Sequence, residues 1–219
     1  MSSNKTARIV TDIAMTILLL ALMAFSLTGR FAHEVIGTLI LVFFLCHLYL
    51  NRGWFKSIGK RRKTGAEIFR TVLILTTTVL FTAQIISGIL LSTHVFSFLP
   101  TVSGTSNIRL LHHFLGQVNF ILLSIHTGTN LRAILAANGF AGPGKKTPKA
   151  ASLLAWIIAA YGIYAFIKLD IIDDLLFREQ FASFSPDGGG FMFIADYFSV
   201  MVLFAVIGHY ITGKKTASQ

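Results

Sequence analysis

Long apolar stretches separated by short polar segments run through the whole sequence. A membrane-crossing helix needs about 20 mostly apolar residues, with roughly 17 to 25 as the working range. Six stretches meet this length or come close to it, and the shortest of them can be extended by its flanks. They cover residues 9–27, 35–50, 71–91, 110–131, 150–167 and 191–211. The pattern therefore predicts an all-α membrane protein with six transmembrane helices.

The composition supports this prediction. Hydrophobic residues make up 54% of the chain, charged residues make up 13%, and the mean hydropathy is +0.71. Too little polar surface is available to coat a water-soluble globule. Twenty phenylalanines exclude a disordered chain, because disordered chains are polar and poor in aromatics. The single cysteine, Cys46, excludes a disulfide framework and any cysteine-rich zinc or iron–sulfur site.

The distribution of charge predicts the orientation of the helices. The chain has 19 Lys and Arg against 9 Asp and Glu, and on a soluble protein the net charge of +10 would suggest nucleic acid as a partner. Here the N-terminus, the second and fourth loops and the C-terminal tail hold 15 of the basic residues. By the positive-inside rule both termini are cytoplasmic, and we expect membrane lipid and no nucleic acid as a partner. The fifth loop is predicted to be an acidic extracytoplasmic segment with Asp170, Asp173, Asp174, Glu179 and Asp187.

Two segments, in the second and fourth predicted helices, repeat one pattern. Residues 33–47 and 112–126 align without a gap and share a histidine at the first position, a glycine at the fifth and a histidine at the fifteenth. An asparagine lies four residues beyond the second histidine in each copy. The helices that precede the two segments end in similar small-residue turns, at Gly29 and Gly88, so the first two helices are predicted to be duplicated as the third and fourth. The matched residues are His33, Gly37, His47 and Asn51 in the first copy and His112, Gly116, His126 and Asn130 in the second.

The spacing of the histidines determines where they lie on a helix. Fourteen residues at about 100° each fall about 40° short of four full turns, so the two histidines of a copy share one face about 21 Å apart. Both copies run from outside to inside in the predicted topology. His33 and His112 then share the outer level of the membrane, and His47 and His126 share the inner level. His113 lies about 140° from the face of His126, so we expect it to pack or to support a neighbour.

Opposed imidazoles in an apolar helical bundle are the axial ligand set of a b-type haem. We therefore expect the four histidines of the repeat to ligate two b haems. Gly37 and Gly116 lie about one turn from the outer ligands on the same face, where a missing side chain would leave room for a porphyrin. Haem propionates are anionic and need partners where the membrane becomes polar. The residues expected there are Arg30 and Arg109 at the outer level and Asn51, Arg52, Asn130 and Arg132 at the inner level.

Five other polar residues carry separate expectations. His94 in the third loop is expected to be solvated rather than part of an electron entry site, and His209 to lie at the membrane interface. Asp12 is close enough to the cytoplasmic end of its helix to reach water and needs no function. Asp196 lies deeper and is a secondary candidate for proton handling. Gln84 in the third helix is expected to form an interhelical hydrogen bond.

The arrangement of Gly29-Arg-Phe-Ala-His33, Gly37, His47, Asn51 and Trp54 resembles the flavinylation-associated family of bacterial transmembrane cytochromes, relatives of the di-haem ferric and ascorbate reductases with a four-helix core. The resemblance covers about residues 9–135. It implies two b haems on the four repeat histidines and a location in the bacterial inner membrane. Family members are associated with extracytoplasmic flavin-bearing domains and pass electrons across or out of the membrane. This chain has no flavin-domain sequence of its own, so a flavin would belong to a partner.

These observations divide the chain into three parts. Residues 1–135 are expected to form the duplicated four-helix di-haem core, 136–149 a cytoplasmic basic loop, and 150–219 a C-terminal transmembrane hairpin with the acidic extracytoplasmic loop. The leading hypothesis is electron transfer, within a membrane oxidoreductase, between a quinone pool or cytoplasmic-side donor and an extracytoplasmic redox partner.

Two alternatives stay open at this point. One is a metal or proton transporter that uses the intramembrane histidines. The other is a membrane anchor whose haems only stabilise the fold. A transporter would normally gather polar groups near the midplane. In this sequence the histidines lie at two separate levels with an apolar stretch between them, which favours haem.

Overall fold

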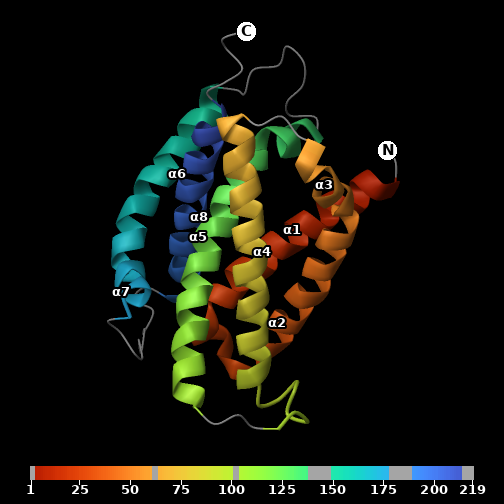
Figure 1. Cartoon of the computed structure of the whole chain (residues 1–219). Helices are drawn as coiled ribbons and strands as arrows, with labels where there is room; N and C mark the ends of the chain where they lie inside the picture. Colours follow the sequence, from red (N-terminus) through yellow and green to blue (C-terminus); the bar gives the residue numbers. More distant parts are fainter. Residues whose placement is uncertain (1–2, 61–63, 101–103, 138–148, 178–188, 214–219) are drawn as a thin grey trace.

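The computed structural model describes residues 3–60, 64–100, 104–137, 149–177 and 189–213, and this part of the chain consists of helices and short connections without a strand (Figure 1). The elements are α1 (Ser3–Met23), α2 (Phe25–Leu50), α3 (Arg52–Ser57), the 3-10 helix η1 (Ile58–Lys60), α4 (Gly65–Leu91), α5 (Thr105–Ala137), α6 (Lys149–Lys168), α7 (Ile171–Leu175) and α8 (Gly189–Gly213). The all-α prediction is confirmed.

Six of the described helices, α1, α2, α4, α5, α6 and α8, are long and apolar enough to cross a membrane. Each corresponds to one of the six predicted spans. Many of their large apolar side chains are exposed, including Val79 at 67% and Phe191 at 82%. Such surfaces are stable against lipid rather than water. The chain is therefore a multi-pass membrane protein.

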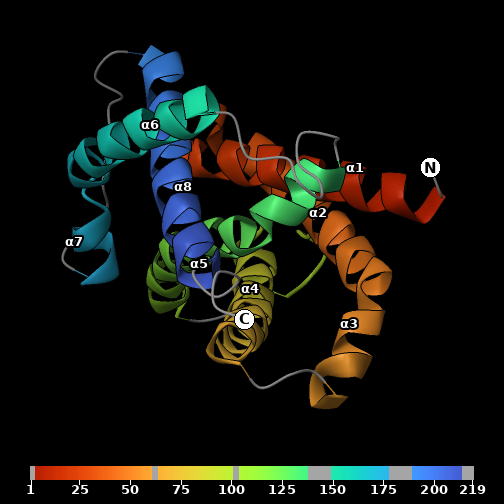
Figure 2. The same cartoon turned by 90° about the horizontal axis from the view of Figure 1, so that it is seen from above.

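The helices pack as hairpins around a central helix. α1 packs against α2, and α5 packs along both α4 and α8, while α6 covers another side of α8. Figure 2 shows α6 and α7 at one side of the bundle and α2 and α3 at the other. α8 therefore lies directly on the helix that carries the second histidine pattern. Of the described helices from residue 149 on, α8 packs on α5 and also contacts α1 and α4, while α6 packs on α8.

Two glycines explain how closely α5 and α8 approach. A Cβ atom on Gly128 of α5 would overlap the backbone carbonyl of Ala205, and one on Gly208 of α8 would overlap the carbonyl of Ile125. Small residues at such crossings let membrane helices gain dispersion contacts along their backbones. Gly128 lies two residues beyond His126, so this contact also fixes the position of the inner end of the repeat.

A buried ion pair connects α6 to α8. The Asp196 side chain is 1% exposed, and its two carboxylate oxygens accept hydrogen bonds from Tyr161 Oη and Lys168 Nζ, each at 2.7 Å. A buried carboxylate needs such partners, because an isolated charge in a low-dielectric interior is costly. These contacts give Asp196 a packing role, and its part in proton handling stays a prediction.

Gly29 breaks the regular course of α2. Its φ of 74° lies in the left-handed region, which separates a short first turn from the long segment that begins at Arg30. The small-residue turn predicted at this position is present. Its counterpart Gly88 keeps helical geometry inside α4, so the two copies differ here. The basic run at 61–63, most of the loop 136–149, most of the turn at 185–190, and the tail lie outside the described residues.

Candidate functional site

The outer histidines of the two copies face each other. The imidazole rings of His33 on α2 and His112 on α5 have centroids 6.2 Å apart and planes inclined by 76°. Both side chains are half-buried. Two residues 79 positions apart in the sequence are thus brought into ring contact at one level of the bundle.

Helix α4 holds the His112 ring through two hydrogen bonds. Ser87 Oγ lies 2.9 Å from Nδ1, and Gln84 Nε2 lies 3.2 Å from Nε2. The Ser87 hydroxyl already donates to the Gln84 carbonyl oxygen at 2.8 Å, so it accepts the Nδ1 proton of His112. An amide nitrogen can only donate, so Nε2 of His112 carries the lone pair. This is the tautomer that a metal-binding Nε2 needs.

The inner histidine of the first copy is held by α1. His47 Nδ1 lies 2.8 Å from a carboxylate oxygen of Asp12. A carboxylate can only accept, so Nδ1 of His47 carries the proton and its Nε2 is left with the lone pair. Among the described residues no ring contact or hydrogen bond joins His47 to His126, so the pairing of the two inner histidines stays a prediction from the repeat.

The duplication extends to a side-chain hydrogen bond four residues beyond each inner histidine. Asn51 Nδ2 donates to the His47 carbonyl oxygen at 2.9 Å, and Asn130 Nδ2 donates to that of His126 at 3.0 Å. Asn51 follows the last residue of α2, whereas Asn130 lies within α5. Their predicted contacts to propionates stay a prediction.

A second pair of contacts repeats one residue earlier. Arg8 of α1 donates to the carbonyl oxygen of Leu50 at 2.8 Å, and Arg70 of α4 donates to that of Thr129 at 2.9 Å. Leu50 and Thr129 occupy the same position of the repeat. In each copy the first helix thus clamps the inner end of the second through an arginine.

The outer pair has the spacing of two ligands on one metal. Metal–nitrogen bonds of about 2.0 Å and about 1.1 Å from nitrogen to ring centroid put two opposed imidazole centroids about 6.2 Å apart. The observed separation of His33 and His112 is 6.2 Å. Coordination by Nε2 of His112 requires the Gln84 amide to rotate away. In the other two histidines of the repeat, His33 and His126, the Nδ1 atoms are buried without a hydrogen-bond partner among the described residues.

The protein supplies two ligands at a level, not three. No group of three or more His, Cys, Asp or Glu that could hold a bare metal ion occurs among the described residues. A zinc-type site takes three or four protein ligands. A haem needs only the two axial ones, because the porphyrin supplies the other four donors. The donor set therefore fits a haem better than a bare transition metal.

The two glycines of the repeat, Gly37 and Gly116, do not lie at close helix–helix contacts, and they leave space beside the helix backbone. A Cβ on Gly37 would meet only a Leu22 methyl at 4.0 Å, and one on Gly116 would meet the Gln84 amide at 3.6 Å. Neither distance is a clash, in contrast to the α5–α8 crossing. Helix packing therefore does not require glycine here, and room for a flat ligand remains the physical explanation.

The arginines predicted at the outer propionates lie near the outer pair. Arg30 is exposed and Arg109 is half-buried, and within the described part of the chain neither forms a hydrogen bond or an ion pair. Both are therefore available to an anionic group. At the inner level, Arg52 stacks on Tyr49 with its Cζ 4.0 Å from the ring centroid and donates to its carbonyl oxygen. The side chain of Arg132 lies outside the described residues.

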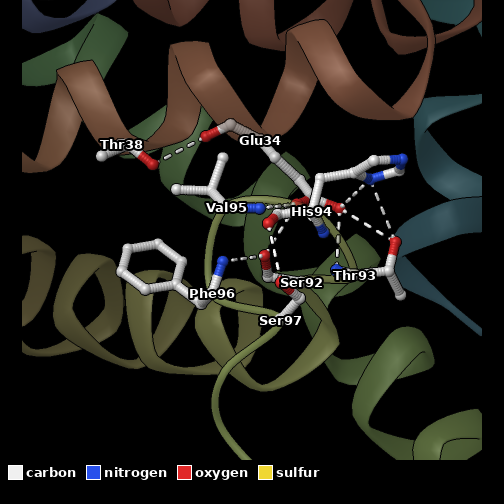
Figure 3. A network of polar contacts seen from close by, with 8 residues as sticks. All are labelled: Glu34, Thr38, Ser92, Thr93, His94, Val95, Phe96 and Ser97. Carbon is white, nitrogen blue, oxygen red and sulfur yellow. Dashed lines mark hydrogen bonds and ion pairs between the residues drawn. The ribbon is translucent and has the colours of Figure 1, made fainter.

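Glu34, the residue after His33, holds the outer loop against α2 (Figure 3). Its carboxylate accepts hydrogen bonds from the backbone amides of Thr93, His94 and Val95 at 2.9–3.0 Å and from Ser92 Oγ at 2.7 Å. His94 Nδ1 lies 3.2 Å from the same carboxylate. The His94 side chain is 47% exposed, in line with the predicted solvated residue. The loop after α4 is thus fastened beside the outer histidine.

Aromatic side chains occupy much of the layer between the two histidine levels. Phe44 of α2 and Phe81 of α4 are buried and form an edge-to-face pair with centroids 4.9 Å apart. Phe120 of α5 is fully buried and packs edge-to-face on Tyr197 of α8. Buried polar side chains share this layer, among them Asn119 of α5, which lies midway between His112 and His126 and donates to the Leu80 carbonyl oxygen at 3.2 Å.

Comparisons of the chain with protein-family models, with curated proteins and with solved structures give no match. The site therefore rests on the geometry of this chain. Sequence analysis missed three of its members, Asp12, Ser87 and Glu34, and for Asp12 it expected only contact with water. Gln84 forms the interhelical hydrogen bond expected of it. The only pattern that could have pointed to Ser87 is its place directly before Gly88 in the repeat.

Proposed function

We propose that this protein transfers electrons across a membrane through two b haems held by the histidine pairs of its duplicated helices. The observation that carries the proposal is the outer pair, in which His33 and His112 from separate copies face each other at 6.2 Å. The inner pair, His47 and His126, follows from the repeat, in which the two histidines occupy equivalent positions. When bound, each haem supplies a one-electron exchange between ferric and ferrous iron.

The residues around each pair would prepare the ligands. Ser87 and Asp12 hold the Nδ1 protons of His112 and His47, which leaves the lone pair of each ligand on Nε2; that of His112 would coordinate once the Gln84 amide rotates away. The Phe44–Phe81 pair lies between the two levels. Arg30 and Arg109 carry positive charge at the outer end, where haem propionates would lie.

The partners follow from orientation and charge. The bias of Lys and Arg supports cytoplasmic termini, and the resemblance to bacterial transmembrane cytochromes supports a location in the bacterial inner membrane. Electrons would then pass between a quinone pool or cytoplasmic-side donor and an extracytoplasmic redox protein, with any flavin on that partner. Asp170, Asp173 and Asp174 around α7 would face this partner and steer a basic surface toward it.

A second candidate function has one observation in its favour. The Asp12–His47 hydrogen bond joins a carboxylate to an imidazole at the inner end of the bundle, as in a proton or metal pathway. A transporter would need further polar groups leading across the membrane. Aromatic side chains occupy much of the layer between the levels, and the buried Asn119 and Ser124 there donate to backbone carbonyl oxygens.

A reduced-minus-oxidised absorption spectrum of the purified chain separates the two functions. Electron transfer predicts a b-type spectrum and two haems per chain, whereas a folded chain without haem would support the transporter. Transfer is then measured in liposomes with an electron acceptor trapped inside and a reductant added outside. The wild-type chain should reduce the acceptor, His112→Ala should not, and His209→Ala should behave like the wild type because His209 lies outside both pairs.

A further inference from the structure

The two copies of the repeat hold their ligands with groups of different charge. At the inner level the Nδ1 proton of His47 is accepted by the carboxylate of Asp12 at 2.8 Å. At the outer level that of His112 is accepted by the neutral hydroxyl of Ser87 at 2.9 Å. Asp12 and Ser87 come from the first helix of their respective copies, α1 and α4. The two levels therefore differ in the charge of the group that holds a ligand histidine.

A carboxylate partner makes an imidazole a stronger donor and adds negative charge near the metal. Reduction places one more electron on the iron, so a nearby negative charge disfavours the reduced state. Hydrogen bonds and charge around the ligands are among the terms that set the reduction potential of a haem. The inner site should therefore be harder to reduce than the outer one.

On the premise of the proposed function, we propose that Asp12 is a positioning residue that lowers the midpoint potential of the inner haem below that of the outer haem. An electron shared between the two sites then resides mainly at the outer level. This makes transfer from the inner to the outer end the downhill direction. Ser87 orients its histidine in the same way but adds no charge.

Other charges near the two levels do not reverse this order. Arg8, one turn before Asp12, donates to the Leu50 carbonyl, which leaves His47 as the ion-pair partner of Asp12. At the outer level the Glu34 carboxylate is turned to the loop after α4, where three backbone amides and the Ser92 hydroxyl offset its charge. Asp12 is the carboxylate that bonds directly to a ligand histidine.

The test is a potentiometric titration of the full-length, haem-loaded chain in detergent. Asp12→Asn keeps a hydrogen-bond acceptor of the same size and removes the charge, and Ser87→Ala is the matched control in the other copy. In Asp12→Asn the lower midpoint should rise by up to about 59 mV, a tenfold change in the one-electron reduction equilibrium, because the Asp12 side chain is 44% exposed and water screens part of its charge. The upper midpoint should stay unchanged, and Ser87→Ala should leave the lower one unchanged. In His33→Ala, which removes the outer site, the remaining midpoint should be the lower one.

Two further variants separate tuning from folding. Asp12→Glu retains a carboxylate and should retain the low potential, while Asp12→Ala should weaken haem binding at the inner site by about 10- to 100-fold. A lower midpoint that does not move in Asp12→Asn, or a shift of the upper midpoint instead, overturns this inference and leaves the proposed function intact. A folded wild-type chain without haem overturns both.

Discussion

Replacing Glu34 with alanine should release the outer loop without unfolding the bundle. The carboxylate is 9% exposed and binds three consecutive backbone amides, of Thr93, His94 and Val95, together with the Ser92 hydroxyl. In Glu34→Ala the exposed Thr93 and His94 amides can bind water instead. The part-buried Ser92 hydroxyl and Val95 amide lose a charged partner that water replaces poorly.

The magnitude follows from these two part-buried hydrogen bonds. Each contributes about 1–1.5 kcal/mol, so the loop should lose about 2–3 kcal/mol of local stability. With about 1.4 kcal/mol for each factor of ten, this corresponds to a roughly 30- to 160-fold loss of amide protection. Glu34→Gln retains one acceptor oxygen without the charge and should lie between the wild type and the alanine variant.

Hydrogen exchange followed by mass spectrometry measures this directly on the peptide that covers residues 92–95. Exchange in α8 around Val200, which is fully buried, should stay as in the wild type. Glu67→Ala, which removes a carboxylate at the opposite end of α4, should leave the outer loop protected. If exchange at 92–95 stays within about threefold of the wild type in Glu34→Ala, the carboxylate does not hold the loop.

Three other substitutions test the packing of the C-terminal helices, each by thermal unfolding in detergent. Burial raises the pKa of Asp174, so the charged carboxylate lowers the stability of the folded chain at any pH above the usual pKa range of an aspartate. Asp174→Asn should therefore unfold at a slightly higher temperature than the wild type at pH 7. In acid, where the carboxyl is protonated, this difference should vanish. Gly128→Ala should destabilise the chain by about 1–3 kcal/mol, because the added Cβ meets the Ala205 carbonyl; an unchanged midpoint would contradict the close crossing. Lys168→Met should lower the free energy of unfolding by about 3–5 kcal/mol, because Asp196 stays buried without its cation. The double variant Lys168→Met with Asp196→Leu should recover most of this loss. If it recovers none, the pair does not act as a unit.

The six long helices could be predicted from the sequence because the bilayer imposes a length and an apolar character on each of them. Six apolar stretches predicted six long helices, and the helical period placed His33 and His112 on faces that the structure brings together. Gly29, where the small-residue turn was expected, does interrupt its helix. These features depend on local chemistry and on a repeat visible within one chain.

The contacts that tune the site could not be predicted in the same way, because they depend on how helices cross. Asp12 reaches His47 only because α1 lies diagonally against α2, and no periodicity encodes that crossing. Glu34 binds a loop some 60 residues further along the chain. The packing of α8 on α5 is likewise set by backbone contacts at Gly128 and Gly208, which look like ordinary glycines in the sequence.

The central claim is that two histidine pairs, one at each level, hold two haems. Haem content and reduced-minus-oxidised spectra of the four single histidine-to-alanine variants test it most directly. The account predicts two haems in the wild type and one in each variant, with the same haem lost from His33→Ala and His112→Ala and the other lost from His47→Ala and His126→Ala. A folded wild-type chain without haem, or variants of one pair that lose different haems, would contradict it.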